Sequence, residues 1–186
     1  MCPLELLAAL LVLINVALVA RRSVWNYAFA IAGVALYALV FYQAKLYSDM
    51  LLQGFFLVIN LYGWRHWSRS LATAGRVSVS RLTPAARAVW LAGIALATFA
   101  WGSAMHRLTD AALPFVDAGI AMTSIVAQIL LSRQKLENWL LWIAVDLVAI
   151  GVYAARDLRV TALLYVLLLG ISIWGLIDWR RAERAA

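Results

Sequence analysis

Long apolar stretches separated by short polar connections dominate the sequence. Seven of them have 17 to 20 residues each: 4–20, 24–42, 48–67, 87–106, 116–132, 136–154 and 160–179. A helix needs about 20 mostly apolar residues to cross the hydrocarbon of a bilayer. Transmembrane β-strands would instead alternate apolar and polar residues over segments of about ten, and these stretches do not alternate. The pattern therefore predicts an all-α integral membrane protein with seven transmembrane helices.

One connection is much longer than the others. The segment 68–86 is rich in Ser, Thr and Arg, a composition typical of an aqueous loop. The residues after the last stretch, 180–186, form a charged tail. The first stretch has no basic segment before it, so we interpret it as a membrane span and not as a cleaved signal peptide.

The composition agrees with a membrane location and excludes several classes of protein. Of the 186 residues, 66% are hydrophobic and 13% charged, whereas soluble domains average roughly 45–50% apolar and about 25% charged. A soluble enzyme is therefore excluded, and a nucleic-acid binder would need a larger polar surface for its basic residues. Cys2 is the single cysteine, which allows no intrachain disulfide or Cys-based metal site. Because the sequence has no Gly-rich phosphate loop or zinc-protease motif, we expect no metal, no cofactor and no ATP-driven pump.

The formal net charge of +7 reflects the placement of Lys and Arg beside the spans. On the side of the N-terminus lie four of the 16 basic residues: Lys45, Arg107, Arg156 and Arg159. On the other side lie the remaining twelve: Arg21, Arg22, Arg65, Arg69, Arg76, Arg81, Arg87, Arg133, Lys135, Arg180, Arg181 and Arg184. Since cytoplasmic loops carry the excess of Lys and Arg, we expect the N-terminus outside and the C-terminus in the cytoplasm.

Shifting the sequence by 112 residues without gaps aligns the first three spans with the last three. The shift pairs polar, glycine and aromatic residues: Glu5 with Asp117, Arg21 with Arg133, Asn26 with Asn138, Tyr27 with Trp139, Phe41 with Tyr153, Tyr62 with Trp174, Gly63 with Gly175 and Trp67 with Trp179. The segments 4–67 and 116–179 are thus predicted to be parallel three-helix repeats, joined by the linker helix 87–106 in a 3+1+3 arrangement. Parallel repeats are typical of transporters, which hold their substrate where the repeats meet.

Polar residues inside the spans lie on three stripes at helical spacing. The stripes are Gln53, Asn60 and Trp64; Ser124 and Gln128 with Asp117; and Asn138, Trp142, Asp146 and Tyr153. A central Asp costs about 2.5–3.5 kcal/mol in a membrane helix, so it usually faces a cavity or a partner. Amides, a carboxylate and aromatic faces together suit a flat polar molecule, and the aromatic faces attract cations.

The same sequence pattern also allows purely structural roles for several polar and aromatic residues in the spans. Asn26 and Asn138 are of the type that caps helices or links them through amide hydrogen bonds. Tryptophans near span ends typically anchor the helix at the membrane interface, namely Trp25, Trp64, Trp67, Trp90, Trp101 and Trp179. Asp146 differs from both groups, because a carboxylate near the bilayer midplane needs a proton, a partner or water.

Two motifs resemble the PnuC family of vitamin transporters. The first runs from Leu46 to Phe56 and on into Asn60–Trp64, and the second runs from Glu137 to Ile143 and leads to Asp146. The resemblance implies a seven-helix 3+1+3 fold related to the SWEET sugar transporters, homotrimers, and facilitated diffusion followed by trapping through a cytoplasmic kinase. By matching motif positions it also assigns Gln53, Asn60, Asn138, Trp142 and Asp146 to the substrate cavity. Some members have Asn in place of Asp146, and others resemble carriers of thiamine or riboflavin.

The best-known members of the family carry nicotinamide riboside, a vitamin B3 precursor, so the resemblance implies an uptake facilitator for this compound in the bacterial inner membrane. It would work by alternating access between the repeats. The predicted substrate-binding residues are Gln53, Asn60, Trp64, Ser124, Gln128, Asn138, Trp142, Asp146 and Tyr153. Alternatives are a carrier of thiamine or riboflavin, and a non-transporting scaffold. An enzyme is disfavoured because Asp117, Asp146 and Ser124 form no recognisable catalytic set.

Overall fold

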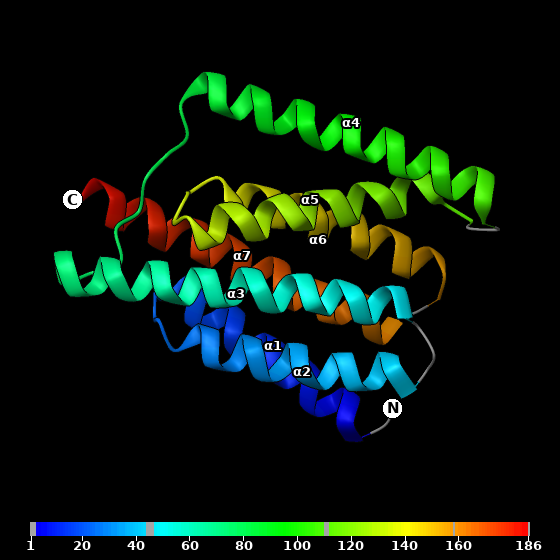
Figure 1. Ribbon diagram of the computed structural model, residues 1–186, viewed down its shortest axis with the longest axis horizontal. Helices are drawn as coiled ribbons and strands as arrows, with labels where there is room; N and C mark the ends of the chain where they lie inside the picture. Colours follow the sequence, from blue (N-terminus) through cyan, green and yellow to red (C-terminus); the bar gives the residue numbers. More distant parts are fainter. Residues whose placement is uncertain (1–2, 44–46, 110–111, 158, 186) are drawn as a thin grey trace. The chain divides into compact units, whose positions relative to one another are not determined.

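The protein forms seven α-helices in a computed structural model, which describes residues 3–43, 47–109, 112–157 and 159–185. They are α1 (Pro3–Ala20), α2 (Asn26–Gln43), α3 (Tyr47–Ala74), α4 (Pro84–Leu108), α5 (Pro114–Ser132), α6 (Asn138–Ala155) and α7 (Arg159–Arg184), shown in chain order in Figure 1. Each overlaps one of the seven predicted spans, and the only β pairing among the described residues is an isolated bridge between Ser80 and Lys135. The prediction of an all-α chain is confirmed.

Several helices are long and apolar enough to cross a membrane. Among the described residues these are α4, α5, α6 and the segment Thr161–Arg184 of α7. Shorter apolar segments lie in α1 (Leu10–Ala20) and α2 (Asn26–Leu39). Both of these helices have 18 residues, which corresponds to about 27 Å of helix against about 30 Å of hydrocarbon. The chain is therefore a multi-pass membrane protein.

The polar segment 68–86 differs from the predicted loop, because helices occupy both of its ends. α3 continues through Ala74 and ends at Gly75, whose φ of 68° lies in the left-handed region that favours glycine. α4 begins at Pro84, so the connection is shorter than predicted. The predicted tail is likewise helical as far as Arg184. Hydropathy marks where apolar residues stop, whereas a polar helix can continue into water because its backbone hydrogen bonds are internal.

The chain divides into two compact units, each described by itself. The first contains residues up to Val79 together with Ser132–Gln134 and Trp174–Ala186. The second contains Ser80–Leu131 and Lys135–Ile173, so α7 contributes to both. In the first unit α2 packs against α1 and against α3.

An aromatic cluster forms the core of the first unit. Tyr27, Trp67 and Trp179 have at most 1% of their surface exposed. The rings of Tyr27 and Trp67 meet edge to face at 5.4 Å, and those of Trp67 and Trp179 lie 5.7 Å apart. Gly63 makes room for this packing, because a Cβ atom there would approach the Tyr27 ring to 2.5–2.7 Å. The cluster thereby fixes α2, α3 and the end of α7 against one another.

Polar contacts fasten the same end of α7 to the turn that follows α1. The indole Nε1 of Trp179 donates to the carbonyl of Val19 at 3.1 Å. Arg22 pairs with the Asp178 carboxylate and donates to the Asp178 backbone carbonyl at 3.2 Å. The Val19 carbonyl also accepts the Arg22 backbone N–H at 2.9 Å, so this oxygen at the end of α1 serves both the turn and the contact with α7.

The turns after α1 and after α5 have the same conformation, 112 residues apart. Arg22 and Gln134 both have positive φ, of 56° and 59°. In each turn a backbone N–H bonds five residues back, from Ser23 to Leu18 and from Lys135 to Leu130, both at 2.9 Å. This is the pattern of a Schellman motif with a left-handed residue after the helix. α2 and α6 then begin at positions that also differ by 112, Asn26 and Asn138.

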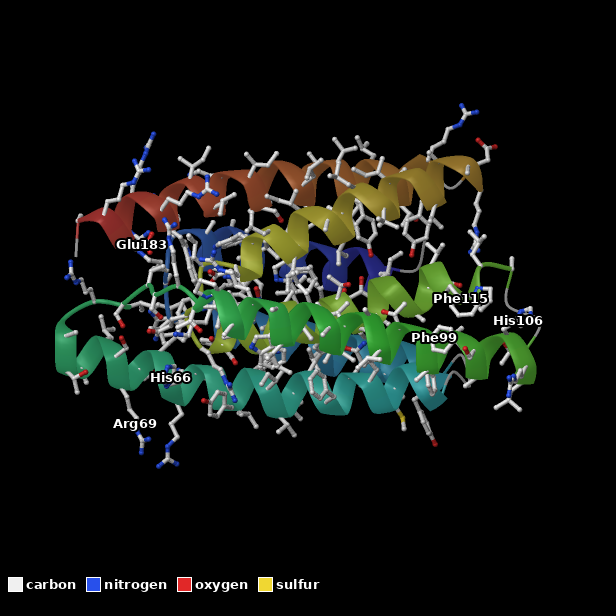
Figure 2. All side chains as sticks on the ribbon, turned by 90° about the horizontal axis from the view of Figure 1, so that it is seen from above. His66, Arg69, Phe99, His106, Phe115 and Glu183 are labelled. Atoms are coloured by element: carbon white, nitrogen blue, oxygen red, sulfur yellow. The ribbon has the colours of Figure 1, made fainter. Side chains whose placement is uncertain are left out.

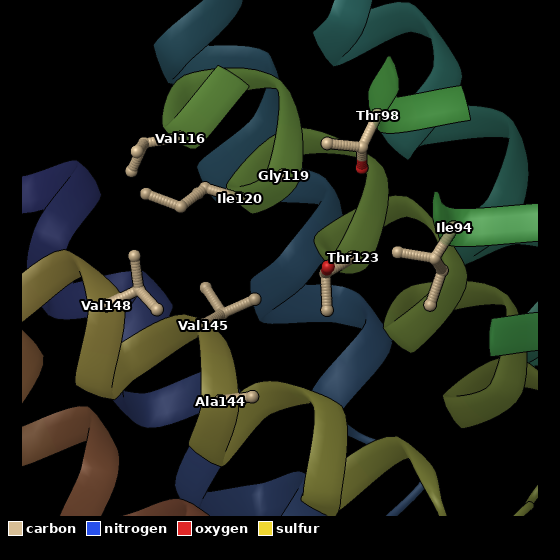
Figure 3. Close-up of a pocket in the computed structure, with 9 residues that line it drawn as sticks. All are labelled: Ile94, Thr98, Val116, Gly119, Ile120, Thr123, Ala144, Val145 and Val148. Carbon is tan, nitrogen blue, oxygen red and sulfur yellow. The ribbon is translucent and has the colours of Figure 1, made fainter. Parts of the chain in front are cut away.

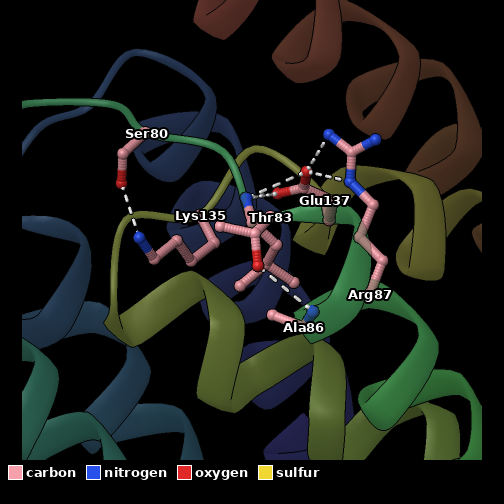
Figure 4. Close-up of polar contacts among 7 residues, drawn as sticks. Ser80, Thr83, Ala86, Arg87, Lys135 and Glu137 are labelled. Atoms are coloured by element: carbon pink, nitrogen blue, oxygen red, sulfur yellow. Dashed lines mark hydrogen bonds and ion pairs between the residues drawn. The ribbon is translucent and has the colours of Figure 1, made fainter.

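In the second unit, a polar clamp holds the segment before α4 against the turn between α5 and α6 (Figure 4). Lys135 Nζ donates to Ser80 Oγ, and the Leu136 N–H donates to the Ser80 carbonyl, both at 2.9 Å. Glu137 accepts the Leu82 N–H at 3.1 Å and the Arg87 guanidinium at 2.8–2.9 Å. We call Ser80, Leu82, Arg87, Lys135, Leu136 and Glu137 the polar clamp.

α4 begins inside this clamp and packs on α5 at its other end. Thr83 caps α4 by accepting the Ala86 N–H at 3.2 Å, directly before Pro84. Near the end of α4, Gly102 is buried, and a Cβ atom there would approach the Phe115 ring to 2.5 Å. His106 lies beside the same ring at 6.4 Å (Figure 2). α4 is thus held at both ends within the second unit.

The packing at Gly63 predicts a test within a single helix. Gly63→Ala should lower the free energy of unfolding by about 2 kcal/mol, because the new methyl group overpacks the Tyr27 ring. Gly54→Ala on the same helix meets no atom within 4 Å and should stabilise α3 by up to about 1 kcal/mol through helix propensity. Thermal unfolding of both variants in detergent measures the difference. Equal melting temperatures would show that Tyr27 does not constrain Gly63.

The polar clamp predicts that Glu137 contributes strongly to stability. Glu137→Ala should lower the free energy of unfolding by about 2 kcal/mol, because it leaves the Leu82 N–H and the Arg87 guanidinium without their acceptor. Asp157→Ala is the matched control, since its pair with Arg159 has side chains 80% and 86% exposed and exposed pairs contribute little. Thermal melting of both variants, purified in parallel, distinguishes them. The clamp has no stabilising role if both melt alike.

Candidate functional site

The nine predicted substrate-binding residues lie on three helices. α3, in the first unit, carries Gln53, Asn60 and Trp64. α5 and α6, in the second unit, carry Ser124, Gln128, Asn138, Trp142, Asp146 and Tyr153. Because all nine positions are helical, the spacings that define the three predicted stripes place each set along one face of its helix.

On α3 the three residues differ in their surroundings. Asn60 is buried, and its side-chain Nδ2 donates to the carbonyl of Phe56, one turn earlier, at 2.8 Å. Gln53 is half-buried and Trp64 is 39% exposed. The Asn60 amide is therefore held in a fixed orientation by its own helix.

On α6, Asp146 has a partner that the sequence analysis missed. The Ser172 hydroxyl on α7 donates to Asp146 Oδ2 at 3.0 Å. Only 3% of Asp146 and 2% of Ser172 are exposed. A serine in an apolar helix attracts no notice by itself, because Ser is common in membrane spans. The sequence nonetheless contains one signal for Ser172, because the 112-residue shift aligns this position with Asn60, a predicted substrate-binding residue.

Asn138 has a structural part in the turn before α6. Its Nδ2 donates to the Lys135 carbonyl at 2.7 Å, and Asn26 makes the corresponding bond to Ser23, also at 2.7 Å. Among the described residues, the buried Asn138 Oδ1 atom has no hydrogen-bond partner. The amide group of Asn138 thus stabilises the turn, as the structural interpretation allowed.

The remaining predicted residues of the second unit are partly accessible. Ser124 and Gln128 on α5 and Trp142 on α6 are half-buried. Tyr153 stacks on Tyr165 of α7, with ring centroids 5.3 Å apart and planes 23° from parallel. α6 therefore presents a tyrosine that stacks on α7, an indole and a carboxylate along one stripe.

The interpretation of span-end tryptophans as membrane anchors is wrong for two of them. Trp67 and Trp179 are completely buried in the aromatic cluster. Trp25 and Trp101, by contrast, are 72% and 53% exposed, as anchors in lipid must be. A position near a span end cannot separate these cases, because it does not reveal which face of the helix meets other helices.

A cavity of about 290 Å³ lies in the second unit among α4, α5 and α6 (Figure 3). Its lining is almost entirely apolar: Ile94, Thr98, Val116, Gly119, Ile120, Thr123, Ala144, Val145 and Val148. None of the nine predicted residues is among these. The cavity is distinct from the polar stripes, and within the described residues no three His, Cys, Asp or Glu side chains are grouped to hold a metal ion.

Comparisons with known proteins agree on one family. The family model described as "Nicotinamide mononucleotide transporter" matches residues 2–181. The nicotinamide riboside transporter PnuC of Escherichia coli (strain K12) is 31% identical over 92% of this chain and 82% of its own length. The riboflavin/roseoflavin transporter RibM of Streptomyces davaonensis is also 31% identical, over 94% of this chain and 83% of its own.

A solved structure shows the same fold. The crystal structure of the vitamin B3 transporter PnuC superposes with a TM-score of 0.78 and 29% identity, covering 98% of this chain and 82% of the other. The predicted transporter, as opposed to an enzyme, is thereby confirmed. With seven helices, the matching family model and this structural neighbour, the chain belongs to the PnuC family of membrane transporters.

Proposed function

We propose that this protein carries nicotinamide riboside across the bacterial inner membrane. The observation that carries the proposal is the buried carboxylate of Asp146 in a transporter whose relatives include nicotinamide riboside transporters. The sequence has no Lys, Arg or His in α5, in α6 or between residues 160 and 173 of α7. A carboxylate in such surroundings is costly unless a positive charge or a proton offsets it.

The charge of the substrate separates the alternatives. Nicotinamide riboside and thiamine carry a fixed positive charge, which complements Asp146. The phosphate of a nicotinamide mononucleotide would add negative charge beside the same carboxylate, which costs energy in a low-dielectric site. Riboflavin is neutral and larger, and it stays the alternative that the RibM relative favours. Charge complementarity therefore ranks nicotinamide riboside first, thiamine second and riboflavin third.

The other predicted residues supply the shape and polarity of the site. Trp142 and Tyr153 stack on the pyridinium ring, whose charge strengthens contact with an aromatic face. Gln53, Asn60 and Gln128 bond the carboxamide or the ribose, because side-chain amides both donate and accept hydrogen bonds. Asn138 does so through Oδ1, since its Nδ2 is used by the turn. Trp64 and Ser124 complete the site. Asp146 balances the charge.

We further propose that the architecture is 3+1+3, with the two repeats alternating access to the substrate. The matching turns at Arg22 and Gln134 support an internal repeat. Trp67 and Trp179 are equivalent positions of the repeats, and their rings are in contact. A rotation that superposes one repeat on the other moves each residue onto its equivalent. Two equivalent residues can therefore be in contact only if both lie close to the rotation axis. Such an axis along the membrane normal suits rocking of one repeat against the other.

Net uptake by facilitated diffusion requires that the vitamin be removed on the inside, because a passive carrier moves its substrate only down the concentration gradient. Twelve of 16 basic residues flank the spans on one side, which supports a cytoplasmic C-terminus. We propose facilitated diffusion inward, with a cytoplasmic kinase trapping the vitamin by phosphorylation. We also propose the homotrimeric assembly that the family resemblance implies.

Counterflow in proteoliposomes tests the function. Vesicles loaded with unlabelled nicotinamide riboside should accumulate labelled nicotinamide riboside unchanged, and a protonophore should not prevent it. Unlabelled thiamine and riboflavin, added outside in separate arms, should compete less well. A scaffold would give no counterflow, and an enzyme would alter the labelled compound. Stronger competition by riboflavin than by nicotinamide riboside itself would reassign the substrate.

The stacking role of Trp142 predicts a selective loss of affinity. Trp142→Ala should weaken binding of nicotinamide riboside by at least about tenfold, because a cation on an aromatic face in a dry site contributes up to about 2 kcal/mol. Trp25→Ala serves as the control, since its side chain is 72% exposed. Isothermal titration of both variants gives the comparison. Equal dissociation constants would remove Trp142 from the site.

A further inference from the structure

We propose that Ser172 is a positioning residue that holds Asp146 as a charged carboxylate and so makes the carrier select cationic over neutral substrates of similar shape. This inference rests on the function proposed above. It adds a residue on α7 to a site that the sequence analysis predicts on α3, α5 and α6.

The geometry is that of a buried hydrogen bond between two helices. Ser172 Oγ lies 3.0 Å from Asp146 Oδ2, and only 2% of Ser172 and 3% of Asp146 are exposed. In such surroundings a carboxylate cannot replace a lost donor with bulk water. The hydroxyl therefore matters more to Asp146 here than it would at the surface of the protein.

This contact favours the ionised carboxylate, because a donated hydrogen bond is stronger to a charged acceptor than to a neutral one. A serine hydroxyl has one proton to donate, and giving it to Oδ2 stabilises the negative charge. A carboxylate has further acceptor positions on both oxygens, so one hydroxyl does not saturate it. Asp146 therefore stays able to pair with the positive charge of a ligand while its orientation is fixed by α7.

The carboxylate of Asp146 has no charged counterpart at the equivalent position of the first proposed repeat. Position 146 corresponds by the shift of 112 to Val34, and position 172 corresponds to Asn60. The second repeat thus has a carboxylate with a hydroxyl where the first has an apolar residue and an amide. The Asn60 amide bonds its own helix at Phe56. This asymmetry suits a ligand with one charged end and one uncharged polar end.

A binding experiment with two ligands of nearly the same shape tests the proposal. Nicotinamide riboside is cationic, whereas its reduced dihydropyridine form is neutral. Ser172→Ala should weaken binding of the cation by about tenfold, a loss of roughly 1.4 kcal/mol. It should change binding of the neutral form by less than about twofold. Ser172→Thr, which keeps the hydroxyl, should restore the parent preference, and Ser103→Ala on α4 controls for removing a membrane-helix hydroxyl.

A double-mutant cycle separates positioning from packing. Asp146→Asn should abolish the preference for the cation, and Ser172→Ala in that background should then have no further effect on it. Equal weakening of both ligands by Ser172→Ala would overturn the proposal, and so would an undiminished effect of Ser172→Ala in the Asp146→Asn background. If Ser172→Ala does not fold, Ser172→Cys keeps the size with a weaker donor and should give an intermediate preference.

The binding experiment distinguishes a failure of this inference from a failure of the proposed function. A parent protein that binds neither form refutes the proposed function and the inference with it. A parent that prefers the cation, with Ser172→Ala retaining that preference in full, refutes only the role of Ser172.

Discussion

Hydrocarbon offers no hydrogen bonds, so a polar group inside the spans is stabilised by finding a partner within the protein. The few such groups in this chain show the consequence. Ser172 donates to Asp146, Trp179 donates to the Val19 carbonyl, and Asn60 donates to the Phe56 carbonyl. Each of these contacts is expensive to break in lipid. The hydrogen bond to Asp146 links α6 to α7, and in the proposed site it also orients the carboxylate.

The turns after α1 and α5 organise the segments around them. Both have the same left-handed residue position and the same backbone bonds. The two turns contact different segments. The turn after α1 holds the end of α7 through Arg22. The turn after α5 holds the segment before α4 through Lys135 and the start of α4 through Glu137. One local conformation, used twice, thus fixes two segments that are distant in sequence. A charge on a rigid turn is well suited to this, because little conformational entropy is lost when it pairs.

The sequence predicted much of the fold and part of the candidate site. Seven helices could be located because each apolar stretch is long enough to span a bilayer. The ends of α3 and α7 could not, because hydropathy falls where the helix leaves the membrane and not where it stops. Asp146 was identifiable as a carboxylate among apolar residues. Ser172 could be noticed only through its alignment with Asn60 in the repeat, since a membrane helix tolerates a serine without any special partner.

The sequence by itself determined which segments avoid water, that its first and last three spans share a pattern, and that a carboxylate lies within a span. These are properties of composition and spacing along the chain. The tertiary structure decided that Trp67 and Trp179 are buried and not lipid-facing, that the Asn138 amide supports a turn, and that Ser172 bonds Asp146. The physical reason is that in lipid the apolar faces of a helix are nearly equivalent, so only contacts between helices determine which face is buried.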